Sequence, residues 1–245
     1  MKAIGIIPAR YKSSRFPGKP LISILGKPLI IHVAEKVEAA LGRDNTIIAT
    51  EDERIQKVVT EYGYKVVMTD SSHPTGTDRL YEVATKNKAD IYLNIQGDEP
   101  MVKPEDIIMI LEKKKLFHNY IINGMCPLSP HEDPASINIP KVVVSLENDL
   151  LYMSRLAIPG IKDPSLGIPI YRKQVCIYAF NFQELEGFAL YKKKMYNEQY
   201  EDIEILRFLE LGFKVKMIET SGASLAVDVP DDVFVVENAL KARSK

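Results

Sequence analysis

The chain has 245 residues, of which 46% are hydrophobic, so it is long and apolar enough to bury one large core. Its 32 Lys and Arg residues nearly balance its 33 Asp and Glu residues, which leaves no global positive field for a nucleic-acid backbone. No apolar run approaches the roughly 18 residues of a membrane span, and Pro8 and Arg10 interrupt the apolar start before it reaches signal-peptide length. We therefore expect one cytoplasmic domain, residues 1–245, that binds neither nucleic acid nor membrane.

The first half of the chain alternates between short apolar runs and helical patterns. The runs predict buried strands, and apolar residues at helical spacing before a stop signal such as Gly42 predict helices. The predicted strands are 3–7, 46–49, 65–68 and 91–95, and the predicted helices are 28–40, 53–62, 78–86 and 104–117. This alternation is typical of an α/β protein with a mostly parallel, Rossmann-like sheet and helices on both faces. Ligands of such sheets bind at the carboxyl ends of the strands.

The pattern loosens after residue 117. The later predicted strands are 141–145, 174–180 and 214–218, the later predicted helices are 203–211 and 231–242, and the Pro- and Gly-rich segment 159–169 is predicted to be a loop. We expect the irregular middle part, about 127–180, to form an arm or a subunit contact.

A basic loop, residues 8–20, follows the first predicted strand. It carries four cations within ten residues, namely Arg10, Lys12, Arg15 and Lys19. At the carboxyl end of a strand these cations favour an anion site, since Arg grips phosphate oxygens with a bidentate fork. The charge alone is also compatible with a solvated basic loop. The glycines fit neither a P-loop nor a dinucleotide fingerprint.

Two aspartates could hold a divalent cation. Asp98 follows the buried run 91–95 and therefore lies at the same predicted sheet edge as the basic loop. Asp228 precedes the last helix, where it could instead cap that helix; Asp231 and Asp232 fit a role in capping or in pairing with the helix dipole. Magnesium is commonly held by one or two carboxylates together with substrate phosphates.

Four motifs in this order resemble those of the 3-deoxy-manno-octulosonate (Kdo) cytidylyltransferases, also called CMP-Kdo synthetases. They are Pro-Ala-Arg-x-x-Ser-x-Arg-x-Pro-Gly-Lys-Pro-Leu from residue 8, Thr-Gly-Thr-Asp-Arg from residue 75, Gln-Gly-Asp-Glu-Pro from residue 96 and Val-Asp-x-Pro-x-Asp from residue 227. The resemblance implies a nucleotidyltransferase (GT-A-like) fold and a magnesium ion held by Asp98 and Asp228. The nucleotide-binding residues that it implies are Ala9, Arg10, Arg15, Lys19, Gly76, Arg79 and Asp98. From the sequence alone, Gly76 could equally cap a helix, and Arg79 could be an ordinary surface residue.

The resemblance is weaker on the acceptor side. It implies that Gln96, Arg155, Gln174, Tyr178 and Glu204 bind the sugar acid. A half-buried strand position for Tyr178 and an exposed helix position for Glu204 are the alternatives. The chain departs from the family where a histidine has become Gln174 and a polar sugar contact has become Ile205. Because an apolar side chain cannot replace a hydrogen bond to a hydroxyl, we expect a modified sugar acid, or even a phosphonate, as an alternative acceptor.

The reaction that the resemblance implies is CMP transfer from CTP to the anomeric hydroxyl of a Kdo-type sugar acid, for bacterial surface polysaccharide. We predict an in-line attack on the α-phosphorus, with Arg10, Lys19, Asp98 and Asp228 as catalytic residues. The two cations, together with Arg15, would stabilise the departing pyrophosphate, and a magnesium ion held by the two aspartates would neutralise the developing charge. The resemblance also implies a homodimer. Two other classes stay open: a nucleotide-sugar glycosyltransferase, although its typical Asp-x-Asp motif is absent at residues 96–100, and a regulator that binds CTP without chemistry.

Overall fold

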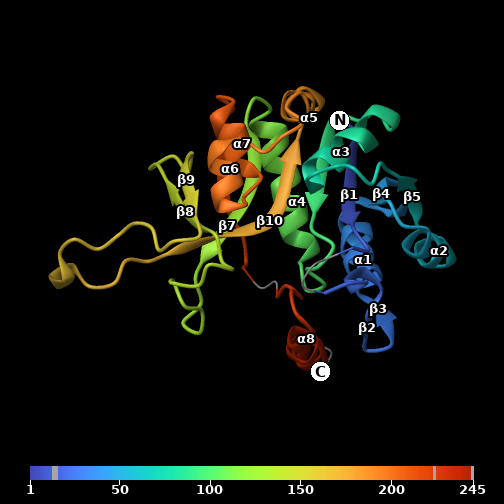
Figure 1. The fold of residues 1–245 in the computed structure, drawn as a ribbon, viewed down its shortest axis with the longest axis horizontal. Coiled ribbons are helices and arrows are strands. Elements are labelled where there is room, and N and C mark those ends of the chain that lie inside the picture. The colour runs from blue at the N-terminus through green and yellow to red at the C-terminus, as the bar shows by residue number, and fades with distance from the viewer. Residues whose placement is uncertain (13–15, 223–224, 244–245) are drawn as a thin grey trace.

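The computed structural model describes residues 1–12, 16–222 and 225–243. Its centre is a twisted sheet in the order β11-β7-β10-β6-β1-β4-β5, with β8 and β9 attached beside β10 (Figure 1). The strands are β1 Ala3–Ala9, β4 Thr46–Thr50, β5 Lys65–Met68, β6 Ile91–Ile95, β7 Ile121–Pro127, β8 Lys141–Val144, β9 Leu150–Ser154, β10 Arg172–Phe180 and β11 Val215–Glu219. A separate hairpin joins β2 Ser23–Ile24 to β3 Lys27–Pro28.

Helices cover both faces of the sheet. They are α1 Leu29–Leu41, α2 Glu53–Glu61, α3 Gly76–Lys86, α4 Pro104–Leu116, α5 Phe182–Ala189, α6 Tyr196–Glu201, α7 Ile205–Glu210 and α8 Pro230–Arg243. The buried side chains of α1, α2 and α4 share one apolar cluster with one face of the sheet, and those of α3, α5 and α7 share a second cluster with the other face. The predicted mostly parallel, doubly covered sheet is therefore confirmed. None of the described helices is long and apolar enough to cross a membrane.

The central strand β10 runs against its neighbours in the sheet. β10 is antiparallel to both β6 and β7, whereas β1, β4, β5 and β6 are mutually parallel and β7 is parallel to β11. Because of this reversal, β10 brings its first half, rather than its end, to the edge where β1 and β6 finish. The region 127–180, which was predicted to form an arm or a subunit contact, thus includes β10, a strand at the centre of the sheet. Only part of this region can leave the body of the molecule.

The part that leaves the body of the molecule lies between β9 and β10. Figure 1 shows this segment, which we call the arm (residues 156–171), extending away from the sheet. It contains one short 3₁₀ turn, Pro164–Leu166, within the predicted loop. Several large apolar side chains on the arm are exposed, among them Leu166 at 83%, Ile168 at 81% and Ile170 at 77% of their surface.

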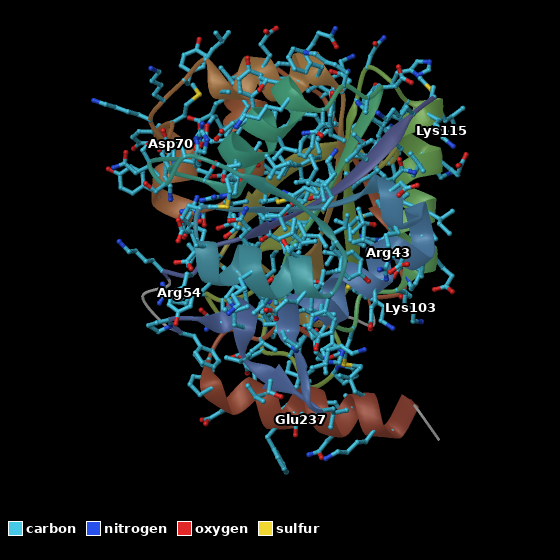
Figure 2. All side chains as sticks on the ribbon, turned by 90° about the vertical axis from the view of Figure 1, so that its right-hand side faces the viewer. Arg43, Arg54, Asp70, Lys103, Lys115 and Glu237 are labelled. Atoms are coloured by element: carbon cyan, nitrogen blue, oxygen red, sulfur yellow. The ribbon has the colours of Figure 1, made fainter. Side chains whose placement is uncertain are left out.

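The last helix covers the β2–β3 hairpin. Val236 of α8 and Val227 before it are buried with Ile24, Leu29 and Met101 in a small apolar cluster. Glu237 on α8 accepts a hydrogen bond from the backbone N–H of Leu25 at 2.9 Å, and Figure 2 shows the helix lying across the end of the molecule with Glu237 labelled. This packing holds the segment that carries Asp228 close to the sheet.

Candidate active site at the carboxyl edge of the sheet

The carboxyl ends of β1 and β6 place the basic loop beside Asp98. The two strands pair in parallel, with Ile6 opposite Asn94, so the residues that follow them emerge together. Gly97 allows a close approach, because a Cβ atom there would lie 2.9 Å from the carbonyl oxygen of Pro8. Asp98 is therefore brought to the edge of the basic loop, as the sequence predicted.

A turn presents Lys19 to this edge. Gly18 has a φ of 73° and donates its N–H to the carbonyl of Tyr11 at 2.9 Å, which closes the loop before the 3₁₀ turn Lys19–Leu21. The ring of Tyr11 packs on Gly18 and is covered from outside by the Arg54 guanidinium, 3.3 Å from the ring centroid. Arg15, a predicted phosphate contact, lies outside the described residues.

Arg10 supplies an available donor. Its Nη2 is buried and has no hydrogen-bond partner among the described residues. A buried N–H group without a partner destabilises the protein. An anion in the adjoining cavity would remove this cost, because it would accept a charge-assisted hydrogen bond from Arg10. Arg10 lines that cavity together with Ala9.

The two aspartates, Asp98 and Asp228, both approach the ammonium group of Lys19. Lys19 Nζ lies 2.7 Å from Asp98 Oδ2 and 3.6 Å from Asp228 Oδ1. The chain segments are joined by a hydrogen bond from the Val227 N–H to the carbonyl of Asp98, at 2.9 Å. The capping role belongs to Asp232, whose carboxylate accepts the backbone N–H groups of Asp228 and Val229 at 2.7 and 2.9 Å. The Asp228 carboxylate lies 3.6 Å from the Lys19 ammonium.

The N-terminus of α3 is held by a carboxylate from the opposite side of the cavity. Glu204, 128 residues from Gly76 along the chain, accepts the Gly76 N–H at 3.1 Å, the Thr77 N–H at 2.9 Å and the Thr77 hydroxyl at 2.5 Å. A carboxylate at this position is favoured by the helix dipole. The alternative of an exposed helix glutamate is wrong for Glu204, and its predicted contact with the sugar acid stays a prediction.

Arg79 lies deeper than predicted. Its side chain is 1% exposed and pairs with Glu51 at 2.9 Å, and its Nη1 donates to Thr69. It lies behind the basic loop, since Glu51 also accepts the backbone N–H of Tyr11. The surface-residue alternative is therefore wrong for Arg79, and it lines neither of the cavities described next. Its direct contact with a nucleotide stays a prediction.

Two adjoining cavities meet at this edge. The first, of about 420 Å³, is lined by the basic loop, the start of α3 and the segment after β6. The second, of about 520 Å³, is lined by the first half of β10, the segment after β9 and the segment before α8. Residues common to both linings are Gln96, Asp98, Asp202 and Glu204. The volumes are typical of small-molecule sites, and we call them the nucleotide cavity and the acceptor cavity.

The predicted acceptor residues Arg155, Gln174 and Tyr178 all line the acceptor cavity. Arg155 is fixed by backbone carbonyls, including those of Ile137 at 2.8 Å and Asp202 at 2.9 Å. Burial raises the pKa of the Tyr178 hydroxyl well above its ordinary value, so this group stays neutral and can donate a hydrogen bond.

The side chains that depart from the family pattern have different environments. Gln174 Nε2 donates to Asn123 Oδ1 at 3.0 Å in the wall of the acceptor cavity. Ile205 is 1% exposed and belongs to the apolar cluster beneath the sheet, so its side chain contacts no solute.

An ion pair in the acceptor cavity was not predicted from the sequence. Lys173 Nζ donates to Glu132, and both side chains line the wall. Glu132 keeps a lowered pKa despite burial, because Lys173 and the N–H of Ser129 bond to its carboxylate. Lys173 directly precedes the predicted strand 174–180, and this charge beside the strand was the available signal.

A metal ion at this edge would need ligands from the substrate. Within the described residues, no group of three or more His, Cys, Asp or Glu side chains could hold one. Asp98 and Asp228 nevertheless converge on a cation, and hard oxygen donors suit magnesium when phosphate oxygens complete its coordination. The residues present therefore fit a magnesium ion that binds together with a triphosphate.

A doubly covered, mostly parallel sheet whose carboxyl edge joins an anion-binding loop, two convergent aspartates and a second cavity defines the protein as a nucleotidyltransferase. The family model "Cytidylyltransferase" matches residues 4–218. The chain belongs to the cytidylyltransferase family.

Relatives that cover nearly the whole chain share one name. The "3-deoxy-manno-octulosonate cytidylyltransferase" of Escherichia coli is 38% identical over 94% of this chain and 92% of its own length. The protein of the same name from Geobacter metallireducens is 39% identical over 98% of both chains. A solved structure of "CMP:2-keto-3-deoxy-manno-octonic acid synthetase complexed with CTP" superimposes with a TM-score of 0.91, at 38% identity and with full coverage of both chains.

Proposed function

We propose that this protein transfers CMP from CTP to the anomeric hydroxyl of 3-deoxy-manno-octulosonate and releases pyrophosphate. The observation that carries the proposal is the position of Asp98 and Asp228. Their carboxylates meet at one cation where the two cavities join, so two substrates bound side by side would react next to them. The names of the full-length relatives agree with this reaction.

The nucleotide cavity would hold the triphosphate. Arg10 offers a buried donor, Lys19 offers an ammonium group, and by family resemblance Arg15 adds a third cation. These charges stabilise the pyrophosphate as the bond between the α- and β-phosphates breaks. Because the Arg10 guanidinium is already buried at the cavity wall, this donor needs little reorganisation during the reaction.

Magnesium is part of the proposal. Asp98 and Asp228 would hold it, and when bound it would supply Lewis-acid neutralisation of phosphate charge. The protein residues would orient the reactants: the α3 N-terminus forms one wall of the nucleotide cavity, and Gln96 lines both cavities. Holding two anions in reacting positions lowers the entropic part of the barrier.

The acceptor cavity would bind the sugar acid. Arg155 lies with its guanidinium fixed at the wall, where the remaining N–H groups could meet a carboxylate. Gln174 and Tyr178 supply polar contacts for hydroxyl groups. A modified sugar acid or a phosphonate is a second candidate, because Ile205 offers no polar contact and Gln174 is already bonded to Asn123.

An acceptor screen tests the proposal. Purified protein with CTP and Mg²⁺ is incubated with Kdo, other 2-keto-3-deoxy sugar acids and phosphonates, and both released pyrophosphate and the mass of the CMP conjugate are measured. We expect CMP-Kdo as the main product. A conjugate with another acceptor only would favour the second candidate, whereas saturable CTP binding without pyrophosphate release from any acceptor would favour a regulator and contradict the proposal.

We also propose that the protein forms a homodimer and that the arm makes the contact between the two copies. We further propose that the enzyme is cytoplasmic, because CTP is available there. Three large apolar side chains on a protruding segment are costly to leave in water, and burying them against a second copy would remove that cost. The double substitution Leu166→Asp and Ile168→Asp should convert the dimer to a monomer in light scattering. The exposed Leu116→Asp, outside the arm, serves as the control; a monomeric wild type, or a dimer that survives the arm substitutions, would contradict the proposal.

A further inference from the structure

The Lys19 ammonium lies between the two aspartates that would hold a metal ion. It is 2.7 Å from the carboxylate of Asp98 and 3.6 Å from that of Asp228, and the Lys19 side chain is only 16% exposed. Two carboxylates brought together without a cation would repel each other. The ammonium therefore stabilises their convergence when no substrate is bound.

The Lys19 ammonium could also bind phosphate groups in the nucleotide cavity. The backbone of Lys19 is fixed by the turn at Gly18, whereas its side chain has four rotatable bonds. Lys19 also lines the nucleotide cavity, as Arg10 does. A triphosphate there offers several negative charges, so the ammonium can move from the aspartates to the phosphates without a change of the backbone.

We infer that Lys19 is an internal cation that reserves the metal position, so that a divalent ion enters only together with the nucleotide. The inference rests on the proposed function and adds an order of binding to it. A monovalent and a divalent cation cannot share so small a space, because their repulsion is strong where water is partly excluded. The metal site becomes available when the triphosphate attracts Lys19 away, and the arriving phosphate oxygens complete the metal's coordination.

Binding of Mn²⁺, used as a spectroscopic probe in place of Mg²⁺, tests this on the full-length protein. Free Mn²⁺ is measured by electron paramagnetic resonance, with and without CTP, for the wild type, Lys19→Met and Lys19→Arg. Without CTP, we expect Lys19→Met to bind Mn²⁺ about 10-fold more tightly than the wild type, since the competing charge is gone. Lys19→Arg keeps the charge and should bind as weakly as the wild type. In the wild type, CTP should raise the Mn²⁺ affinity by about 100-fold or more.

Two controls locate the effect. Lys194→Met removes a positive charge from the same cavity but from a lysine that pairs with Asp202, so it should leave Mn²⁺ binding without CTP unchanged. Adding Asp98→Asn to Lys19→Met should abolish the gain. Circular dichroism of each variant verifies that it is folded.

Three results would overturn the inference. If Lys19→Met binds Mn²⁺ no more tightly than the wild type while CTP still promotes binding in the wild type, Lys19 does not reserve the site, and the proposed function stands. If Lys194→Met gains as much as Lys19→Met, a general field acts instead of a local exchange. If the wild type binds no Mn²⁺ even with CTP, both the inference and the magnesium part of the proposed function fail.

Discussion

A buried ion pair beneath the nucleotide cavity makes a sharp prediction. Arg207 on α7 and Glu198 on α6 are both fully buried and bond through a bidentate fork, at 2.6 Å from Nε and 2.7 Å from Nη2. Removing one partner of a buried pair commonly costs about 3–5 kcal/mol, because the other charge stays buried. In Glu198→Gln, the amide oxygen still accepts one bond, and Asp78 still lies 3.6 Å from Arg207 Nη1. We therefore expect a loss near the lower end, about 3 kcal/mol.

Equilibrium unfolding in urea measures this loss in the free energy of unfolding. For a chain of this size, a loss of that magnitude should lower the melting temperature of Glu198→Gln by about 6–12 °C. Glu38→Gln is the matched control. Arg43 bonds Glu38 through the same fork, at 3.0 Å for each bond, but on the surface, where Figure 2 shows Arg43. Exposed pairs stabilise proteins little, and the amide oxygen of Gln can still accept the Tyr64 hydroxyl that Glu38 accepts at 2.5 Å, so the control should lose only a small fraction of the effect. Equal losses in the two variants would refute the argument that burial sets the energy of this pair.

Three further predictions concern the site and its surroundings. Asp98→Asn or Asp228→Asn should lower the rate of pyrophosphate release about 100-fold or more, and near-normal turnover in either variant would contradict the metal assignment. The control Asp232→Asn keeps an oxygen for its backbone contacts, so its rate should stay within a few-fold of the wild-type rate. Glu204→Gln weakens the hydrogen bonds to the α3 N-terminus, so we expect a several-fold higher KM for CTP and a free energy of unfolding in urea that is lower by about 1–2 kcal/mol. An unchanged unfolding midpoint would count against this role of Glu204. Burial raises the pKa of the Cys126 thiol to about 11, which leaves it neutral at pH 8; mass spectrometry after iodoacetamide treatment should find it modified only in denaturant, and rapid modification of the native protein would contradict its burial.

The sequence predicted the first half of the fold well because its signals are local. Each of β1, β4, β5 and β6 is a short apolar run between helices whose buried faces repeat at helical spacing. β7 was missed, since Asn123 and Gly124 interrupt its apolar pattern. The structure buries Asn123 completely, and its amide donates to the carbonyls of Val175 and Ile177, at 2.9 and 3.0 Å, where β10 is irregular. Such partners lie about fifty positions away, so no local pattern reveals them.

The candidate site divides in the same way. Motifs identified residues such as Arg10 and Asp98, because fixed residue types at fixed spacing follow each strand. The contact between Glu204 and the α3 N-terminus and the place of Lys19 between two aspartates depend on how distant segments meet. These features came only with the three-dimensional arrangement.

The reversed direction of β10 has a consequence for how such enzymes diversify. The beginning of this strand forms the acceptor wall, while the triphosphate side draws mainly on the segments after β1 and β6 and on the start of α3. Substitutions in one stretch of polypeptide can therefore alter which sugar is chosen without disturbing the stretch that recognises the energy-rich donor. A protein built on this plan can therefore change its acceptor while it keeps the same nucleotide donor.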